Sequence, residues 1–164
     1  MHFTNAMCTT FEKFLTLFQT KAPLVHVLYD QLVELLTALL VRFMKADVVT
    51  AAAKDSPEKL ANIDVENVNS HLSSDDLSIG ETTRSELRKL KSDAQRKAIL
   101  GMRAFFTTAT KFLQTRLPLS NKLLKHLSCL EPKKKAIREH SHSIGYIAKM
   151  FNMSAEHINK VTDE

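Results

Sequence analysis

The chain has 164 residues, a net charge of +5, 44% hydrophobic and 25% charged residues, which fits one globular domain and permits nucleic-acid partners without requiring them. Only 3 Gly and 4 Pro are present, and this scarcity disfavours strands joined by tight turns and favours long helices. Two cysteines, Cys8 and Cys129, exclude a disulfide framework, and residues 1–14 show no signal-peptide pattern, so we expect an intracellular protein.

Apolar residues at helical spacing predict a first amphipathic helix over Thr10–Phe18 and a tight connection from Gln19 to Ala22. The run Pro23–Lys45 is the most apolar of the chain. A membrane span needs about 20 nearly uncharged residues, and this run is interrupted by charged residues at positions 30, 34 and 42. We therefore predict a core helix that is packed on more than one side, with a recognition groove as the alternative.

Residues 46–81 are acidic and rich in Ser and Asn, and we interpret them as a long connector on the surface. Helical periodicity returns over Glu81–Arg116, as one long helix or as two that meet near Ser92 and Asp93. A short helix over Asn121–Leu130 and a pair over Lys134–Asn152 and Ser154–Val161 follow.

These elements predict an all-α fold, an irregular bundle of about five to seven helices with a long acidic connector. We expect one helical domain over residues 1–164. It would comprise an N-terminal helical hairpin (10–45), the acidic connector (46–81) and a basic helical half (82–164).

The basic half carries fifteen Lys and Arg residues between positions 84 and 138, opposed by three acidic residues. A solvated helix surface would explain this pattern, and so would a surface that contacts phosphates. The fifteen are Arg84, Arg88, Lys89, Lys91, Arg96, Lys97, Arg103, Lys111, Arg116, Lys122, Lys125, Lys133, Lys134, Lys135 and Arg138.

Two patterns are compatible with metal or DNA binding. His126 with Cys129, followed by His140 and His142, supplies zinc-ligand residue types but not the paired-cysteine finger spacing, so we expect no metal and no other cofactor. Residues 143–161 fit the apolar spacing of a helix-turn-helix, with Asn152 able to adopt the left-handed turn conformation. An ordinary helical hairpin is the alternative.

Catalytic signals are weak. Asp75 and Asp76 are adjacent, but they lie in a polar segment rather than on a rigid element that could hold Mg²⁺. Neither GxGxxG nor GxxxxGK[ST] occurs in the chain. We therefore expect no enzymatic activity from this chain alone.

An ordered set of short motifs resembles the hAT superfamily of transposases and the host proteins derived from them. The motifs are LFQ (17–19) before Pro23, HVLY (26–29), FMK (43–45), IG (79–80), RAFF (103–106) and LPLSNKLL (117–124). The resemblance covers most of the chain, in order, and its motifs are packing motifs.

In this family an RNase H-like domain carries an Asp, Asp, Glu triad that binds Mg²⁺, and an all-helical domain is inserted before the glutamate. The chain resembles part of that insertion, and none of the catalytic residues has a counterpart here. The resemblance implies a non-catalytic fragment that acts in the nucleus. Its partners would be DNA, the missing RNase H-like domain or another transposase subunit. We expect no membrane contact. The DNA contact would run through Lys133, Lys134, Lys135 and Arg138.

Two other functions stay open at this stage. The chain could be a small DNA-binding regulator that uses the helix-turn-helix of residues 143–161, or a structural protein-interaction domain. Binding to duplex DNA that weakens with salt separates the first two functions from the third.

Overall fold

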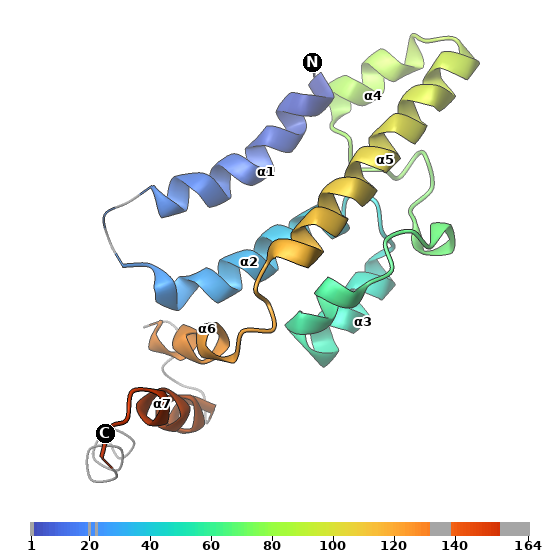
Figure 1. Ribbon diagram of the computed structural model, residues 1–164. Coiled ribbons are helices and arrows are strands. Elements are labelled where there is room, and N and C mark those ends of the chain that lie inside the picture. Colours follow the sequence, from blue (N-terminus) through green and yellow to red (C-terminus); the bar gives the residue numbers. More distant parts are fainter. Residues whose placement is uncertain (1, 20, 22, 132–138, 155–164) are drawn as a thin grey trace. The chain divides into compact units, whose positions relative to one another are not determined.

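The computed structural model describes residues 2–19, 21, 23–131 and 139–154, and these residues form an all-α fold, as predicted (Figure 1). Apart from one isolated bridge between Met44 and His71, the described residues contain no β-structure. The α-helices are α1 (His2–Phe18), α2 (Val25–Leu40), α3 (Ala46–Asp55), α4 (Glu81–Arg88), α5 (Ser92–Arg116), α6 (Lys122–Leu127) and α7 (Glu139–Met150); the 3-10 helices are η1 (Pro57–Asn62), η2 (Val68–Ser70) and η3 (Ser128–Leu130).

The chain divides into two compact units where the sequence predicted one domain. The first unit consists of Met1–Thr20 with Val33–Leu117, and the second of Lys21–Leu32 with Pro118–Glu164. Helix α2 is continuous from Val25 to Leu40 and contributes residues to both units.

Helix α2 is the predicted core helix, and most of the leucines along it are buried as expected. Leu36, Leu39 and Leu40 have no exposed surface, and Tyr29 is also buried. The helix ends at Leu40 rather than Lys45. The carbonyl of Arg42 accepts a hydrogen bond from the amide of Ser78 (2.8 Å), and that of Phe43 accepts one from Leu72 (2.7 Å). These long-range bonds replace the helical ones.

Helix α1 begins eight residues earlier than the sequence indicated. Phe3 and Met7 extend the apolar stripe by two turns toward the N-terminus. Met7 is buried, and the Phe3 ring packs edge-on against Phe105 (5.4 Å between centroids) and Phe106 (5.6 Å). The amino end of α1 is thereby fixed against the middle of α5.

An aromatic cluster occupies the core of the first unit. Phe43 and Phe106 are both fully buried, and their rings stack with centroids 5.5 Å apart and 3° between planes. The His71 ring meets Phe43 edge-on at 5.3 Å. Aromatic pairs of this kind contribute about 0.5–1.5 kcal/mol beyond the burial of their area. They join α5, the residues after α2 and the 46–81 segment.

The 46–81 segment is not the surface connector that its composition suggested. It forms α3, η1 and η2, and it supplies five buried apolar side chains to the core: Val49, Leu60, Val65, Leu77 and Ile79. Gln114 of α5 donates from its side-chain amide to the carbonyls of Leu60 (3.1 Å) and Ile63 (2.9 Å). The many acidic and polar residues of this segment hid these single apolar positions, since none repeats at a regular period.

Residues 69–79, which we call the strap, run beside the residues that follow α2; they include the end of η2 and a turn at 74–76. Lys45 donates its amide to Ser70 (2.8 Å), in addition to the two bonds from Leu72 and Ser78. Four cationic side chains from other elements donate to carbonyls of the strap. They are Arg42 to Ser78 (3.3 Å), Lys45 to Asn69 (2.7 Å), Arg103 to Leu72 (2.7 Å), and Arg84 to Leu77.

The run from 81 to 116 is two helices, one of the two alternatives the sequence left open. Gly80 precedes α4 with φ +84°, and a Cβ there would come within 3.3 Å of the Ala6 side chain of α1. Gly80 is therefore required both for its backbone conformation and for the close approach of α1. Helix α5 is preceded by Lys91, which forms no side-chain cap.

In the second unit, α6 begins at an Asn121 cap whose side-chain oxygen accepts the Leu124 amide (3.2 Å). Helices α6 and α7 and the 3-10 helix η3 pack together. Ala148 of α7 is buried, and its small side chain permits close packing. Cys129 of η3 is buried as well.

Replacing Arg42 with Met is expected to lower the free energy of unfolding by about 1–2 kcal/mol, because the carbonyl of Ser78 and the hydroxyl of Thr10 (2.8 Å) lose a charged donor. Burial lowers the pKa of Arg42, which shows that its guanidinium is already partly withdrawn from water. Urea unfolding measures the change. The control is Lys54→Met on the exposed surface of α3, which should change stability by less than about 0.5 kcal/mol.

Candidate nucleic-acid interface

The four residues predicted to contact DNA, Lys133, Lys134, Lys135 and Arg138, lie outside the described residues, and so do residues 155–161 of the proposed helix-turn-helix. The structure does describe eleven of the fifteen basic residues of the C-terminal half. Those that precede Leu117 belong to the first unit, and Lys122 and Lys125 to the second.

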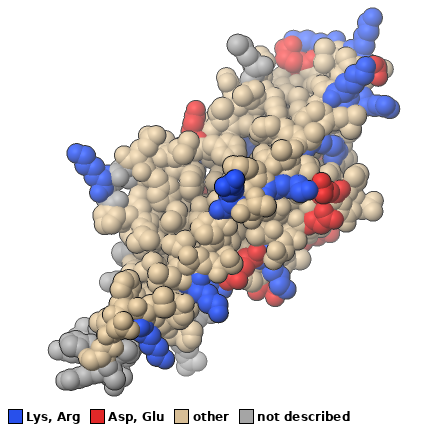
Figure 2. Space-filling model, viewed as in Figure 1, with Lys and Arg blue, Asp and Glu red and all other residues tan. Residues whose placement is uncertain are grey.

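The densest group of described cations lies at the junction of α4 and α5. Residues 81–103 include seven basic residues and three acidic ones. Figure 2 shows Lys and Arg side chains gathered at the upper right, where Figure 1 places the turn between these helices. We call this group the α4–α5 basic surface; its cations are Arg84, Arg88, Lys89, Lys91, Arg96, Lys97 and Arg103.

The cations of this surface differ in their hydrogen-bond and ion-pair partners. Arg84 and Arg103 are anchored to the strap. Three others pair with acidic side chains at the surface: Lys89 with Glu86 (2.6 Å), Lys97 with Asp93 (3.0 Å) and Arg88 with Glu81 (3.8 Å). Exposed pairs of this kind contribute about 0–1 kcal/mol, so their cations can exchange partners for a phosphate at little cost.

Arg96 has a different setting. Within the described part of the chain it forms no ion pair, and it lines a pocket of about 200 Å³. The other lining residues are Ser74 of the strap and Ser92, Gln95, Ile99, Leu100 and Arg103 of α5. The sequence placed Arg96 among fifteen basic residues without distinguishing it. Its neighbour Ser74 is 22 positions away in a segment expected to be a connector, so no local pattern could have joined them.

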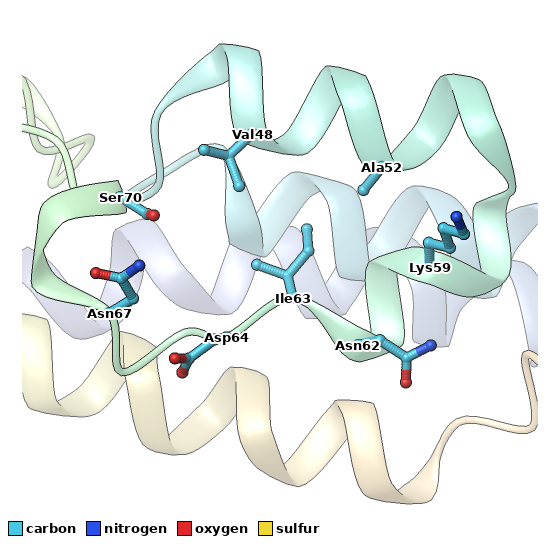
Figure 3. A pocket seen from close by; sticks show the side chains of 8 residues that line it. All are labelled: Val48, Ala52, Lys59, Asn62, Ile63, Asp64, Asn67 and Ser70. Carbon is cyan, nitrogen blue, oxygen red and sulfur yellow. The ribbon is translucent and has the colours of Figure 1, made fainter.

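A larger pocket, of about 440 Å³, lies between α3 and the segment that follows it. In Figure 3, Val48 of α3 and Ile63 point toward each other, and polar side chains surround them. Most of the polar groups already serve the local fold. Lys59 pairs with Asp55, an oxygen of Asp64 accepts the Glu66 amide (3.0 Å), and Asn67 accepts the Asn69 amide (3.1 Å). This pocket therefore offers few convergent groups to a ligand.

In the second unit, His126 is the centre of a polar cluster between α6 and α7. Its ring stacks on Tyr146 (4.2 Å between centroids), and its Nδ1 lies 3.0 Å from the Ser143 hydroxyl. The His142 ring is 5.6 Å away. Burial, followed by the nearby charges of His142, Lys125 and Lys122, lowers the pKa of His126.

Among the residues whose side chains are described, no three His, Cys, Asp or Glu side chains are grouped closely enough to hold a metal ion. The His126 and Cys129 pattern thus does not assemble a zinc site there, and the side chain of His140 is outside the described set. In the strap, the carboxylate of Asp76 accepts a hydrogen bond from the Ser73 hydroxyl (2.7 Å).

No family model, curated protein or solved structure matches the chain. None of the helices in the described residues has the length and apolar character required to cross a bilayer.

Lowering the pH from 7.5 to 5 is expected to loosen the packing of α6 against α7. Because the folded state lowers the pKa of His126, its contribution to stability is present above the unfolded value of about 6.5 and is lost as the pH falls through the lower, folded value. Hydrogen exchange of the α7 amides, corrected for intrinsic rates, measures the loosening.

The control is His126→Phe, which keeps a ring against Tyr146 and should abolish most of the pH dependence. An equal acid-induced change in the variant and the wild type would assign the effect to another group.

Proposed function

We propose that the chain is a non-catalytic helical DNA-contacting unit that resembles part of the insertion domain of hAT-type transposases. The observation that supports it best is the charge of the α4–α5 basic surface, seven cations against three acids over 23 residues. Phosphate contacts by Lys and Arg provide sequence-independent affinity for DNA, and this surface offers such contacts.

The motifs that carry the resemblance occupy packing positions, which is compatible with the proposal. Tyr29, Phe43, Met44 and Leu119 are buried. Residues 117–119 end helix α5 at a proline, as the family's corresponding motif would. In this proposal the protein acts in the nucleus, and its protein partner is an RNase H-like domain or another transposase subunit.

Full-length protein is expected to bind a 20-base-pair duplex without sequence preference, and the binding should weaken as salt increases. Neutralising Lys133, Lys134 and Lys135 to Gln should lower the slope of log K against log salt by about 2–3, because each phosphate contact contributes about 0.9. Fluorescence anisotropy at several salt concentrations measures this.

The matched control neutralises Lys13, Lys54 and Lys59, which removes the same charge outside the basic half. If the wild type shows no duplex binding at low salt, the proposal is wrong and the structural interaction domain is favoured. Cleavage of the duplex by this chain with Mg²⁺ alone would contradict the non-catalytic assignment.

One observation favours a small helix-turn-helix regulator as a second candidate. Helix α7 ends at Met150, and Asn152 just beyond it has a φ of 53°, the left-handed conformation that the sequence allowed. The amide of Asn152 donates to Lys149 (3.1 Å) and that of Met153 to Ala148 (2.9 Å). This is a Schellman ending, which turns the chain sharply out of the helix, as a helix-turn-helix requires.

If the regulator is correct, the protein should prefer one duplex in a selection from random sequences, and Asn159→Ala with Lys160→Ala should remove that preference. Each lost base contact would reduce discrimination by about 1–3 kcal/mol. The Lys13→Ala variant is the control and should keep the preference. Selection that returns no enriched sequence would exclude this candidate.

A further inference from the structure

The pocket lined by Arg96 brings together the groups that bind an oxyanion. Arg96 and Arg103, which carry guanidinium groups, line it together with Ser74, Ser92 and Gln95, whose side chains carry hydroxyl and amide groups. None of the lining residues is acidic. Guanidinium and hydroxyl donors are the side chains that most often contact phosphate oxygens.

The fold positions these donors before any ligand arrives. Arg103 donates one N–H of a terminal nitrogen to the Leu72 carbonyl (2.7 Å). This bond fixes the guanidinium beside the strap and leaves its other N–H donors for a ligand. The strap in turn is held by its backbone bonds to residues 42–45. Ser92, Gln95 and Arg96 are held by the first turns of α5. The backbone of the pocket is therefore ordered before binding, while the exposed Arg96 side chain still loses rotamer freedom when it binds a ligand.

Two of the three acids near the lining residues in sequence have described partners, and Asp75 is the third. Asp93 pairs with Lys97 at 3.0 Å, and Asp76 accepts the Ser73 hydroxyl at 2.7 Å. The Arg96 side chain forms no ion pair among the described residues, so an anion would not have to displace a carboxylate from it.

Size limits what the pocket can take. Sites for drug-sized molecules occupy about 300–1,000 Å³, whereas this pocket measures about 200 Å³. It is too small for a whole nucleotide and suits one tetrahedral anion. Ile99 and Leu100 provide an apolar wall, against which the carbon atoms of an attached sugar can pack.

We propose that this pocket binds one phosphate group, held by Arg96 and Arg103, and that the group belongs to the backbone of duplex DNA. The assignment of this phosphate to duplex DNA rests on the function proposed above. The pocket places a phosphate contact on the α4–α5 basic surface, at residues distinct from Lys133, Lys134, Lys135 and Arg138.

Three variants of the full chain test the proposal. Arg96→Gln removes a charge from a residue that lines the pocket. Lys97→Gln removes the same charge from the same basic surface, one residue along the helix, at a residue that does not line the pocket and that pairs with Asp93. Arg96→Lys keeps the charge but loses the planar fork. Both positions are exposed, so circular dichroism should show unchanged helicity and an unchanged melting temperature for all three variants.

The first measurement is duplex binding. Arg96→Gln should weaken it about five- to tenfold and lower the salt slope by about 1. Lys97→Gln should weaken duplex binding by about twofold or less. The loss of affinity in Arg96→Lys should lie between the losses in the other two variants. If the wild type binds the duplex and Arg96→Gln behaves like Lys97→Gln, the pocket assignment is overturned while the proposed function stands.

The second measurement is a titration with inorganic phosphate, followed by the amide resonances of the chain. The amides of Ser74, Ser92 and Gln95 should shift in the wild type and in Lys97→Gln, and not in Arg96→Gln. If these shifts occur and the wild type does not bind the duplex, the phosphate site is retained but the bound phosphate does not come from DNA. That outcome would contradict the proposed function. Absence of the shifts in the wild type would overturn the site itself.

Discussion

The fold of the first unit depends on how the strap is held. Residues 69–79 are polar at their surface and bury only Leu77 and Ile79, which is little apolar area for a segment of this length. Cationic side chains from the end of α2, from α4 and from α5 compensate by donating to its carbonyls, which would otherwise lack partners. The strap thereby adds a connection between α4, α5 and the residues that follow α2.

This arrangement gives the basic residues of the chain two different roles. Those that donate to the strap are structural, and their guanidinium groups are oriented by the backbone they bind. Those at the α4–α5 turn are exposed and pair weakly, so their charge faces solvent and any approaching polyanion. Arg103 takes part in both, since one nitrogen contacts Leu72 while the side chain lines the pocket with Arg96.

Regular periodicity made α2 and α5 predictable, because many apolar residues repeat at helical spacing in each. The strap and η1 were missed, since Leu60, Leu77 and Ile79 are isolated apolar residues among polar ones and their burial depends on partners far along the chain. The helical start at His2 was missed because only Phe3 and Met7 mark it. The pocket at Arg96 joins two segments that are separate in sequence, which no local pattern reveals.

The two compact units are interleaved along the polypeptide, and this constrains how the molecule can be divided. Each unit is discontinuous in sequence, because Lys21–Leu32 belongs with Pro118–Glu164 while the flanking stretches belong with the other unit. No single cut of the backbone can therefore release either unit intact. A ribosome must also complete Pro118–Glu164 before Lys21–Leu32 has all of its native neighbours, although that stretch is made early.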